Sequence, residues 1–266
     1  MTATTLERTM VVPRSGHEPI PFARLTSVEL RKMFDTRSGF WLLASILILS
    51  VTATGAVIAF AADADLTYDS FGAAVGVPMT VVLPLLAALS VTSEWSQRSG
   101  LSTFTMVPQR ARVIGAKAVA TLLVGVASML VALAVGAVGN VVGTALAGTD
   151  LVWDISLAQM GGIVLANVLG MLVGFMLGVL LRSSAGAVVG YFVYSFVLPG
   201  LSSLLAASQE WFRDLGPWID FKWASSRLYD STMTGESWAQ LATSAAIWLV
   251  APLVLGLVLL FRSEVK

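Results

Sequence analysis

The chain has 266 residues, of which 56% are hydrophobic and 12% are charged, and its mean hydropathy is +0.83. Soluble globular domains carry about 25% charged residues, so this composition excludes an ordinary soluble protein and indicates an integral membrane protein. The formal net charge is zero, cysteine is absent and the single histidine is His17. Disulfides, cysteine nucleophiles and a metal site built from histidines are therefore excluded.

The N-terminal segment changes character near residue 20. Residues 1–20 are polar and are predicted to form a disordered cytoplasmic tail. Residues 21–39 predict an amphipathic helix on the inner membrane surface, in which Thr26 and Glu29 have the spacing of a capping box. The alternative is a basic signal that only fixes orientation. Apolar and basic side chains interleave here: Phe22, Leu25, Leu30, Met33 and Phe34 with Arg24, Arg31 and Lys32.

Six long apolar stretches fill most of residues 40–266. A helix needs roughly 20 apolar residues to cross a bilayer, and each stretch meets or exceeds that length. Lys117 is the one ionisable residue inside them. We therefore expect an all-α protein with six transmembrane helices. The stretches run from Trp41 to Ala62, Phe71 to Thr92, Val113 to Ala147, Leu157 to Leu181, Ala185 to Ala207 and Gln240 to Phe261.

The third stretch is longer than a bilayer requires. As a helix, its residues would rise roughly 50 Å, against a hydrocarbon core of about 30 Å. We expect it to project, tilt or break, with Gly139-Asn140 and Gly143 as the favoured points of bending.

The gap between the last two stretches is the sizeable outer segment. Ser208 predicts the N-cap of a short helix there, and Gly216-Pro217 predicts its end. The aromatic residues Trp211, Phe212 and Trp218 favour a re-entrant segment that lies in or dips into the outer interface.

The charges in the gaps alternate in sign along the chain. Thirteen of the sixteen Lys and Arg residues fall in the N-terminal segment, the second gap and its flank, the fourth gap and the C-terminal tail. The remaining gaps hold three basic residues and ten acids. Cytoplasmic loops retain Lys and Arg, so both termini are expected on the cytoplasmic side of a cell membrane.

The interiors of the apolar stretches offer little for chemistry. Asn167 is the most conspicuous polar residue at mid-depth, and its alternative role is a local or interhelical hydrogen bond. Without carboxylates or histidines inside, proton-coupled transport and intramembrane metalloproteolysis are disfavoured. The sequence has no phosphate-binding loop and no room for an ATPase domain. Energy for any pumping must come from another chain.

Small and aromatic residues mark two further features. Gly170, Gly174 and Gly178 form overlapping G-x-x-x-G units, which predict close helix packing within the chain or a contact between subunits. The fifth stretch carries Phe192, Tyr194 and Phe196 before Pro199. These aromatics form either a constriction or pocket for an apolar ligand, or an ordinary lipid-facing surface.

The second inner loop has the form of a docking element. It is short, polar and basic, with the aromatic Phe104 exposed amid charges that could orient it in a partner's pocket. Its charged residues are Glu94, Arg98, Arg110 and Arg112, followed by Lys117 in the third stretch.

At these residues the chain resembles the permease subunits of type-2 ABC exporters, the class of drug, sodium and polysaccharide efflux systems. The shared features are the acidic-aromatic pair Glu94-Trp95, Gly100, the cluster from Pro108 to Arg112, and Lys117. The basic Glu29-Leu30-Arg31-Lys32 before the first stretch matches as well. Leu101 departs from the pattern, because threonine is common there.

The resemblance implies a half-transporter. Two copies, or this chain and a sister, would form a twelve-span pore above separate nucleotide-binding subunits that hold ATP and Mg, and this chain itself would bind no cofactor and be no enzyme. The second and fifth spans would line the path, with Met79 and Leu83 on the second. Glu94, Arg98, Phe104, Arg110 and Arg112 would couple it to the ATPase, with Glu94 and Arg98 paired to the inner surface helix.

An uncharged, aromatic interior favours an amphipathic or apolar cargo, such as a drug, an antibiotic peptide or a lipid. Sodium is disfavoured because no obvious ligands for the ion are present. The alternative function is a non-transporting membrane scaffold or immunity protein that binds a ligand or partner. Membrane lipids are expected partners in both cases, and nucleic acid in neither.

Overall fold

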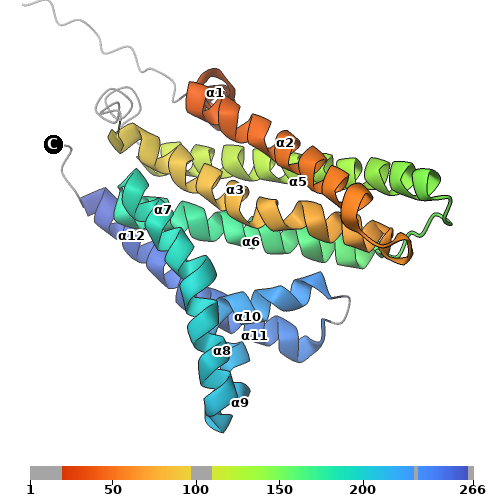
Figure 1. Cartoon of the computed structure of the whole chain (residues 1–266). Helices are drawn as coiled ribbons and strands as arrows, with labels where there is room; N and C mark the ends of the chain where they lie inside the picture. Colours follow the sequence, from red (N-terminus) through yellow and green to blue (C-terminus); the bar gives the residue numbers. More distant parts are fainter. Residues whose placement is uncertain (1–19, 97–109, 231–232, 263–266) are drawn as a thin grey trace, which may run out of the picture.

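The computed structural model describes residues 20–96, 110–230 and 233–262, and all the elements in these ranges are helices (Figure 1). Six of the helical segments are long and apolar enough to cross a membrane. They run Gly39–Phe60, Tyr68–Ser93, Ala111–Ala147, Leu157–Leu181, Ser184–Ser208 and Gly235–Arg262. The prediction of an all-α, six-span membrane protein is confirmed, and below we number these spans one to six.

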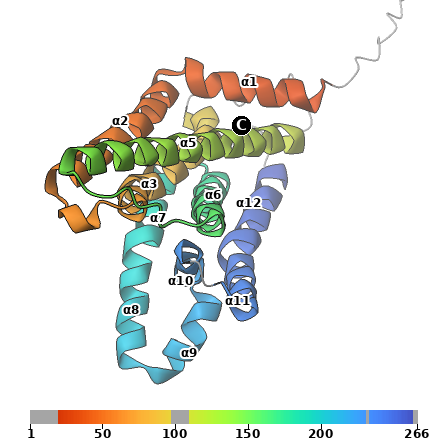
Figure 2. The ribbon, with the colours of Figure 1, turned by 90° about the vertical axis from the view of Figure 1, so that its right-hand side faces the viewer.

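The first described helix is α1 (Phe22–Asp35), which packs against α5 and leads into α2 (Arg37–Phe60), the first span (Figure 2). The predicted capping box at Thr26 is wrong, because the helix already starts at Phe22. The Thr26 hydroxyl instead donates to the carbonyl of Phe22 (3.1 Å). The true side-chain cap in this region is Thr36, which accepts from the Gly39 amide and starts α2.

Spans two to four form the centre of the molecule. They are α3 (Tyr68–Ser96), α5 (Arg110–Ala147) and α6 (Leu157–Leu181), and α3 packs against both α5 and α6. The core between them contains Met79, Leu83 and Met171, each at most 1% exposed. The short helix η1 (Asp63–Asp65) joins the first span to the second.

The third span lies in one continuous helix of 38 residues, so the predicted break at Gly139-Asn140 and Gly143 is wrong. These glycines instead make room for a neighbour: a Cβ at Gly139 or Gly143 would lie 3.0 Å from the Phe71 ring. Asn140 donates its side-chain amide to the carbonyl of Val152 (2.8 Å), which ties the following loop to the helix.

Spans five and six are each divided into three segments. Span five consists of α7 (Ser184–Phe192), the π-helical turn η2 (Val193–Val197) and α8 (Leu198–Ser208). Span six repeats the arrangement with α11 (Gly235–Ala245), the π-helical turn η4 (Ala246–Val250) and α12 (Ala251–Arg262). In both spans a proline, Pro199 or Pro252, follows two residues after the π turn.

The segment between spans five and six folds back toward the bundle. It contains α9 (Glu210–Ile219), α10 (Phe221–Ser226) and η3 (Arg227–Tyr229), and η3 packs on α6. Two predictions are wrong here. Ser208 ends α8 rather than capping α9, and α9 continues through Gly216-Pro217 to Ile219. Its end is held by the Trp248 indole, which donates to the Ile219 carbonyl (2.6 Å).

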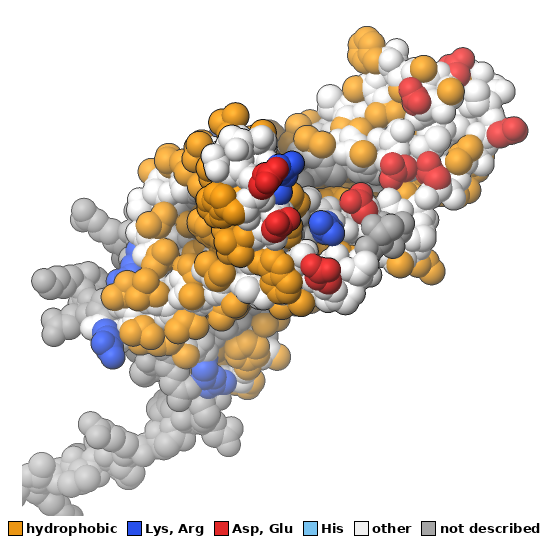
Figure 3. Space-filling view, turned by 90° about the horizontal axis from the view of Figure 1, so that it is seen from below, with side chains coloured by type: hydrophobic (Ala, Val, Ile, Leu, Met, Phe, Trp, Pro, Cys, Tyr) orange, Lys and Arg blue, Asp and Glu red, His pale blue; other side chains and the backbone are white. Residues whose placement is uncertain are grey.

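Charge separates the two ends of the molecule. Figure 3 shows Lys and Arg gathered at one end of one face and Asp and Glu at the opposite end, with apolar surface and charges of both signs between them. We call the end with α1 and Arg262 the basic end. The end with Asp63, Asp65 and Asp150 is the acidic end.

Candidate functional site at the basic end

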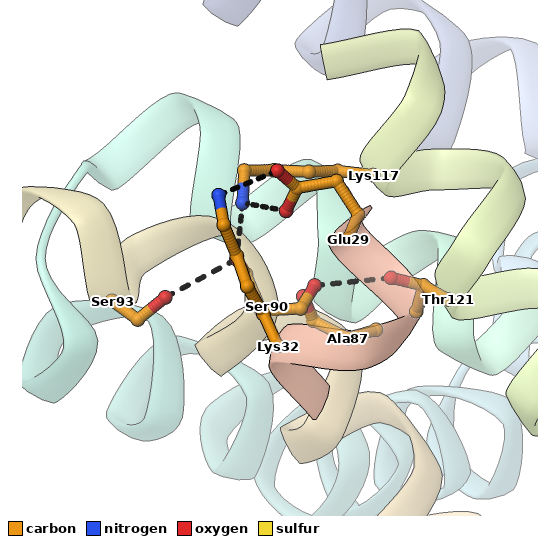
Figure 4. A network of polar contacts seen from close by, with 7 residues as sticks. All are labelled: Glu29, Lys32, Ala87, Ser90, Ser93, Lys117 and Thr121. Atoms are coloured by element: carbon orange, nitrogen blue, oxygen red, sulfur yellow. Dashed lines mark hydrogen bonds and ion pairs between the residues drawn. The ribbon is translucent and has the colours of Figure 1, made fainter. Parts of the chain in front are cut away.

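A network of polar side chains joins three helices at the basic end (Figure 4). We call it the base network. It consists of Glu29 and Lys32 from α1, Ser90 and Ser93 from α3, and Lys117 and Thr121 from α5.

The centre of the base network is an ion pair between Glu29 and Lys117. Glu29 accepts from the Lys117 ammonium at 2.5 Å and from the Lys32 ammonium at 2.6 Å. The Glu29 and Lys117 side chains are 9% and 4% exposed, whereas Lys32 is 43% exposed. A buried charge is strongly unfavourable once its partner is removed, so this pair fixes α1 to the third span.

The second span is joined to the same network through Ser90. The Ser90 carbonyl accepts from the Lys117 ammonium (3.4 Å) and from the Ser93 hydroxyl (3.3 Å). The Ser90 hydroxyl lies 3.1 Å from the Thr121 hydroxyl and donates to the Ala87 carbonyl (2.7 Å). Glu29 on α1 is thereby connected to the last turns of α3 and the first turns of α5.

The start of α1 makes a second contact with α5. Arg112 donates to the Ile20 carbonyl (2.7 Å), and the Phe22 ring lies beside Gly115. Helix α1 therefore meets α5 both at Arg112 and at Lys117. Residues 97–109, which hold the predicted docking loop, connect the same two helices, α3 and α5.

Of the predicted coupling residues, only Arg112 can be placed with its side chain. Arg98 and Phe104 lie outside the described residues, and the side chains of Glu94 and Arg110, at the ends of α3 and α5, are not described either. The predicted pairing of Glu94 and Arg98 with α1 stays a prediction. Glu29 was not singled out as a functional residue by the sequence, although the lone Lys117 in an apolar stretch signals that a nearby carboxylate is needed.

The residues predicted to line a path fall into two groups. Met79, Leu83 and Asn167 are buried within this chain, and Asn167 donates to the Ile163 carbonyl (2.9 Å) one turn earlier in α6. Phe192 and Phe196 are 40% and 60% exposed, and their rings stack with centroids 5.8 Å apart. Tyr194 is half-buried beside Tyr191, with ring centroids 6.2 Å apart. The structure therefore brings only the aromatic residues of span five to a surface.

The glycine stripe of α6 packs against α3 of the same chain. A Cβ at Gly174 would lie 2.1 Å from the Pro84 carbonyl oxygen, and one at Gly178 would lie 2.9 Å from that of Ala88. Gly170 has more room, with the Pro84 ring at 3.6 Å. Because α3 occupies this face, the alternative of a subunit contact through Gly174 and Gly178 is wrong, and the packing is intrachain.

The described side chains offer no constellation for metal binding, since no group of three or more His, Asp or Glu residues within the described ranges could hold an ion. A scan against models of known protein families gives no match, and no curated protein matches the sequence either.

Proposed function

We propose that this chain is the membrane-spanning half of an ATP-driven exporter, energised by separate ATPase subunits. The base network carries the proposal. It connects a surface helix, through a buried ion pair, to the two spans that flank the polar docking loop. A force applied by a partner at that loop would reach α1, α3 and α5 together.

The distribution of charge supports an orientation for this proposal. Cytoplasmic segments retain Lys and Arg, so the basic end faces the cytoplasm of a cell and both termini lie there. The docking loop is then accessible to a soluble ATPase, which would bind ATP and Mg. The acidic end, with Asp63, Asp65 and Asp150, faces the outside.

The exposed surfaces support assembly with a second permease, either another copy or a sister chain. Span five buries few residues, and its aromatic residues Phe192 and Phe196 are 40% and 60% exposed. In the proposed dimer this surface would line the route of an amphipathic or apolar cargo, such as a drug, an antibiotic peptide or a lipid.

Co-purification from the native membrane tests the proposal. The tagged chain, extracted in a mild detergent, is expected to retain an ATPase subunit that binds ATP. Phe104→Ala is expected to lose that subunit because it removes the aromatic residue of the docking loop. Phe60→Ala, at an 88% exposed phenylalanine near the acidic end, is the matched control and is expected to retain it.

Two outcomes would contradict the proposal. If the wild-type chain retains no ATPase, the alternative of a non-transporting scaffold or immunity protein is favoured. If Phe104→Ala and Phe60→Ala retain it equally, the ATPase does not dock where the proposal places it.

A further inference from the structure

The two halves of span five are held in different ways. The half nearer the basic end, α7, is bonded to α3 at both of its ends. Ser184 donates its hydroxyl to the Thr92 hydroxyl (2.8 Å). About two turns further along, the Tyr191 hydroxyl donates to the carbonyl of Thr80.

The acceptor of the Tyr191 bond exists because of a proline. In a regular helix the carbonyl of Thr80 would accept from the amide of residue 84. Residue 84 is Pro84, which has no N–H. A carbonyl left without a donor inside a membrane is costly, and the Tyr191 hydroxyl, whose side chain is 1% exposed, supplies that donor.

Beyond Tyr194, which still packs on the core, the span loses its close contacts with the bundle. The π-helical turn η2 follows, and then Pro199 removes another backbone donor, the one that would bond Ser195. Helix α8 has no buried residue, and its substantial contacts are with η2 and α9. Figure 2 shows α8 projecting from the bundle while α7 lies against it.

We propose that span five is a hinged helix, in which Tyr191 fixes the stationary half α7 to the proline kink of α3, residues 193–199 form the pivot, and α8 is the moving arm. The exposed Phe192–Phe196 pair spans the junction of α7 and η2, so movement of the arm changes the aromatic surface that this span presents. This inference goes beyond the proposed exporter function, because the hinge is defined by contacts within this chain and does not depend on an ATPase subunit.

Electron–electron distance measurements on the full chain in lipid nanodiscs test the hinge. The natural sequence has no cysteine, so introduced cysteines can be spin-labelled without background. One label is placed on α5 at Val138→Cys and the other on α8 at Leu204→Cys; the control pair replaces Leu204→Cys with Val189→Cys on α7. All three positions are more than 60% exposed. The α8 pair is expected to give a broader distance distribution than the α7 pair, and equal widths would overturn the proposal.

The role of Tyr191 is tested by Tyr191→Phe, which removes only the hydroxyl. The α7 distribution is expected to broaden. Tyr194→Phe is the matched control and should leave it unchanged, because the Tyr194 hydroxyl makes no hydrogen bond within the described residues. An α7 distribution that is unchanged in Tyr191→Phe would contradict the role of Tyr191.

Two further variants separate positioning from stability. Pro84→Ala combined with Tyr191→Phe gives the Thr80 carbonyl an intrahelical donor, so thermal stability should recover while the α7 distribution stays broad. If thermal stability and the narrow α7 distance distribution both recover, Tyr191 acts only on stability, and its positioning role is overturned.

If Tyr191→Phe does not fold, Pro199→Ala still tests the pivot. The restored amide of residue 199 can donate to the Ser195 carbonyl, which should narrow the α8 distance distribution. An α8 distribution that is unchanged in Pro199→Ala contradicts the pivot.

Discussion

Spans four and five have the same length, 25 residues, and follow one another in the chain, but they pack very differently. Helix α6 buries ten of its residues against its neighbours, whereas α8, the outer half of span five, buries none of its eleven. Both are strongly apolar. In a bilayer, apolar side chains gain nothing by leaving lipid for protein, so helix contacts depend on close packing and hydrogen bonds.

The difference between the two spans therefore lies in their small and polar residues. Span four carries glycines that admit the backbone of α3 at Gly174 and Gly178. In span five, a hydrogen bond joins each end of α7 to α3, whereas the described residues of α8 make no hydrogen bond to another span. The packed region includes the base network, and the loosely held region is α8. Four predictions test this contrast.

The largest effect is expected in the base network. Glu29→Gln should lower the free energy of unfolding by about 3–5 kcal/mol, because it leaves the buried Lys117 charge without its carboxylate. Lys117→Met should cost less, because Glu29 keeps its ion pair with Lys32. The double variant should cost less than the sum of the two, because neither buried charge remains. Thermal unfolding in detergent measures all three. Strictly additive losses would mean that the pair does not join α1 to α5.

A second large effect is expected at the glycine contact. Gly174→Ala places a Cβ against the Pro84 carbonyl and should destabilise the chain by about 1–3 kcal/mol, because neither backbone can easily move. Gly170→Ala is the matched control on the same face, since its Cβ meets the Pro84 ring at an ordinary distance of 3.6 Å. Equal melting temperatures of the two variants would contradict close packing at Gly174.

A smaller effect is expected where span six holds the outer segment. Trp248→Phe removes the indole donor to the Ile219 carbonyl and should cost about 1 kcal/mol. Hydrogen exchange should rise in α9 and stay unchanged in α6. Trp238→Phe, at a 48% exposed tryptophan, is the control and should leave exchange in α9 as it is.

The smallest effect concerns Lys222 on α10. Burial lowers the pKa of Lys222, and the nearby Asp220 carboxylate opposes that shift only in part. Since the folded chain then holds the proton less tightly than the unfolded chain, protonated Lys222 opposes folding at neutral pH. The penalty falls as pH rises toward the ordinary lysine pKa of about 10.4. Lys222→Met should raise the melting temperature at pH 7 slightly, and the gain should shrink at pH 10.

The spans themselves could be predicted because a helix that crosses lipid needs an apolar run of about 20 consecutive residues, which is visible in the sequence. All six spans are confirmed. For α5, the break is the alternative that is wrong, because Gly139 and Gly143 have the same appearance in a break and in a close contact. The positions of the Thr54 methyl group and the Phe71 ring, on other helices, distinguish the two.

The failures at helix ends have a related cause. Thr26 and Ser208 are good caps by residue type, but Thr26 lies within α1 and Ser208 is the last residue of α8. The role of Glu29 depended on which carboxylate the fold brings to Lys117, a partner 88 positions away in the sequence. Residues this far apart in the chain carry no local pattern. The π-helical turns could not be predicted either. Pro199 and Pro252 show where the helix loses a backbone donor, but they do not indicate that the preceding turn is π-helical.

Because α5 is long and unbroken, a small tilt at one of its ends produces a large displacement at the other. Its 38 residues make a rod of about 57 Å. Lys117 is clamped near one end, and Asn140 holds the loop at Val152 near the other. These two contacts are separated by about 35 Å at 1.5 Å per residue, so a tilt of roughly 5° about the first moves the second by about 3 Å. A displacement of that size equals the length of a hydrogen bond, which is enough to move the Asn140 amide from the Val152 carbonyl to another carbonyl of the loop.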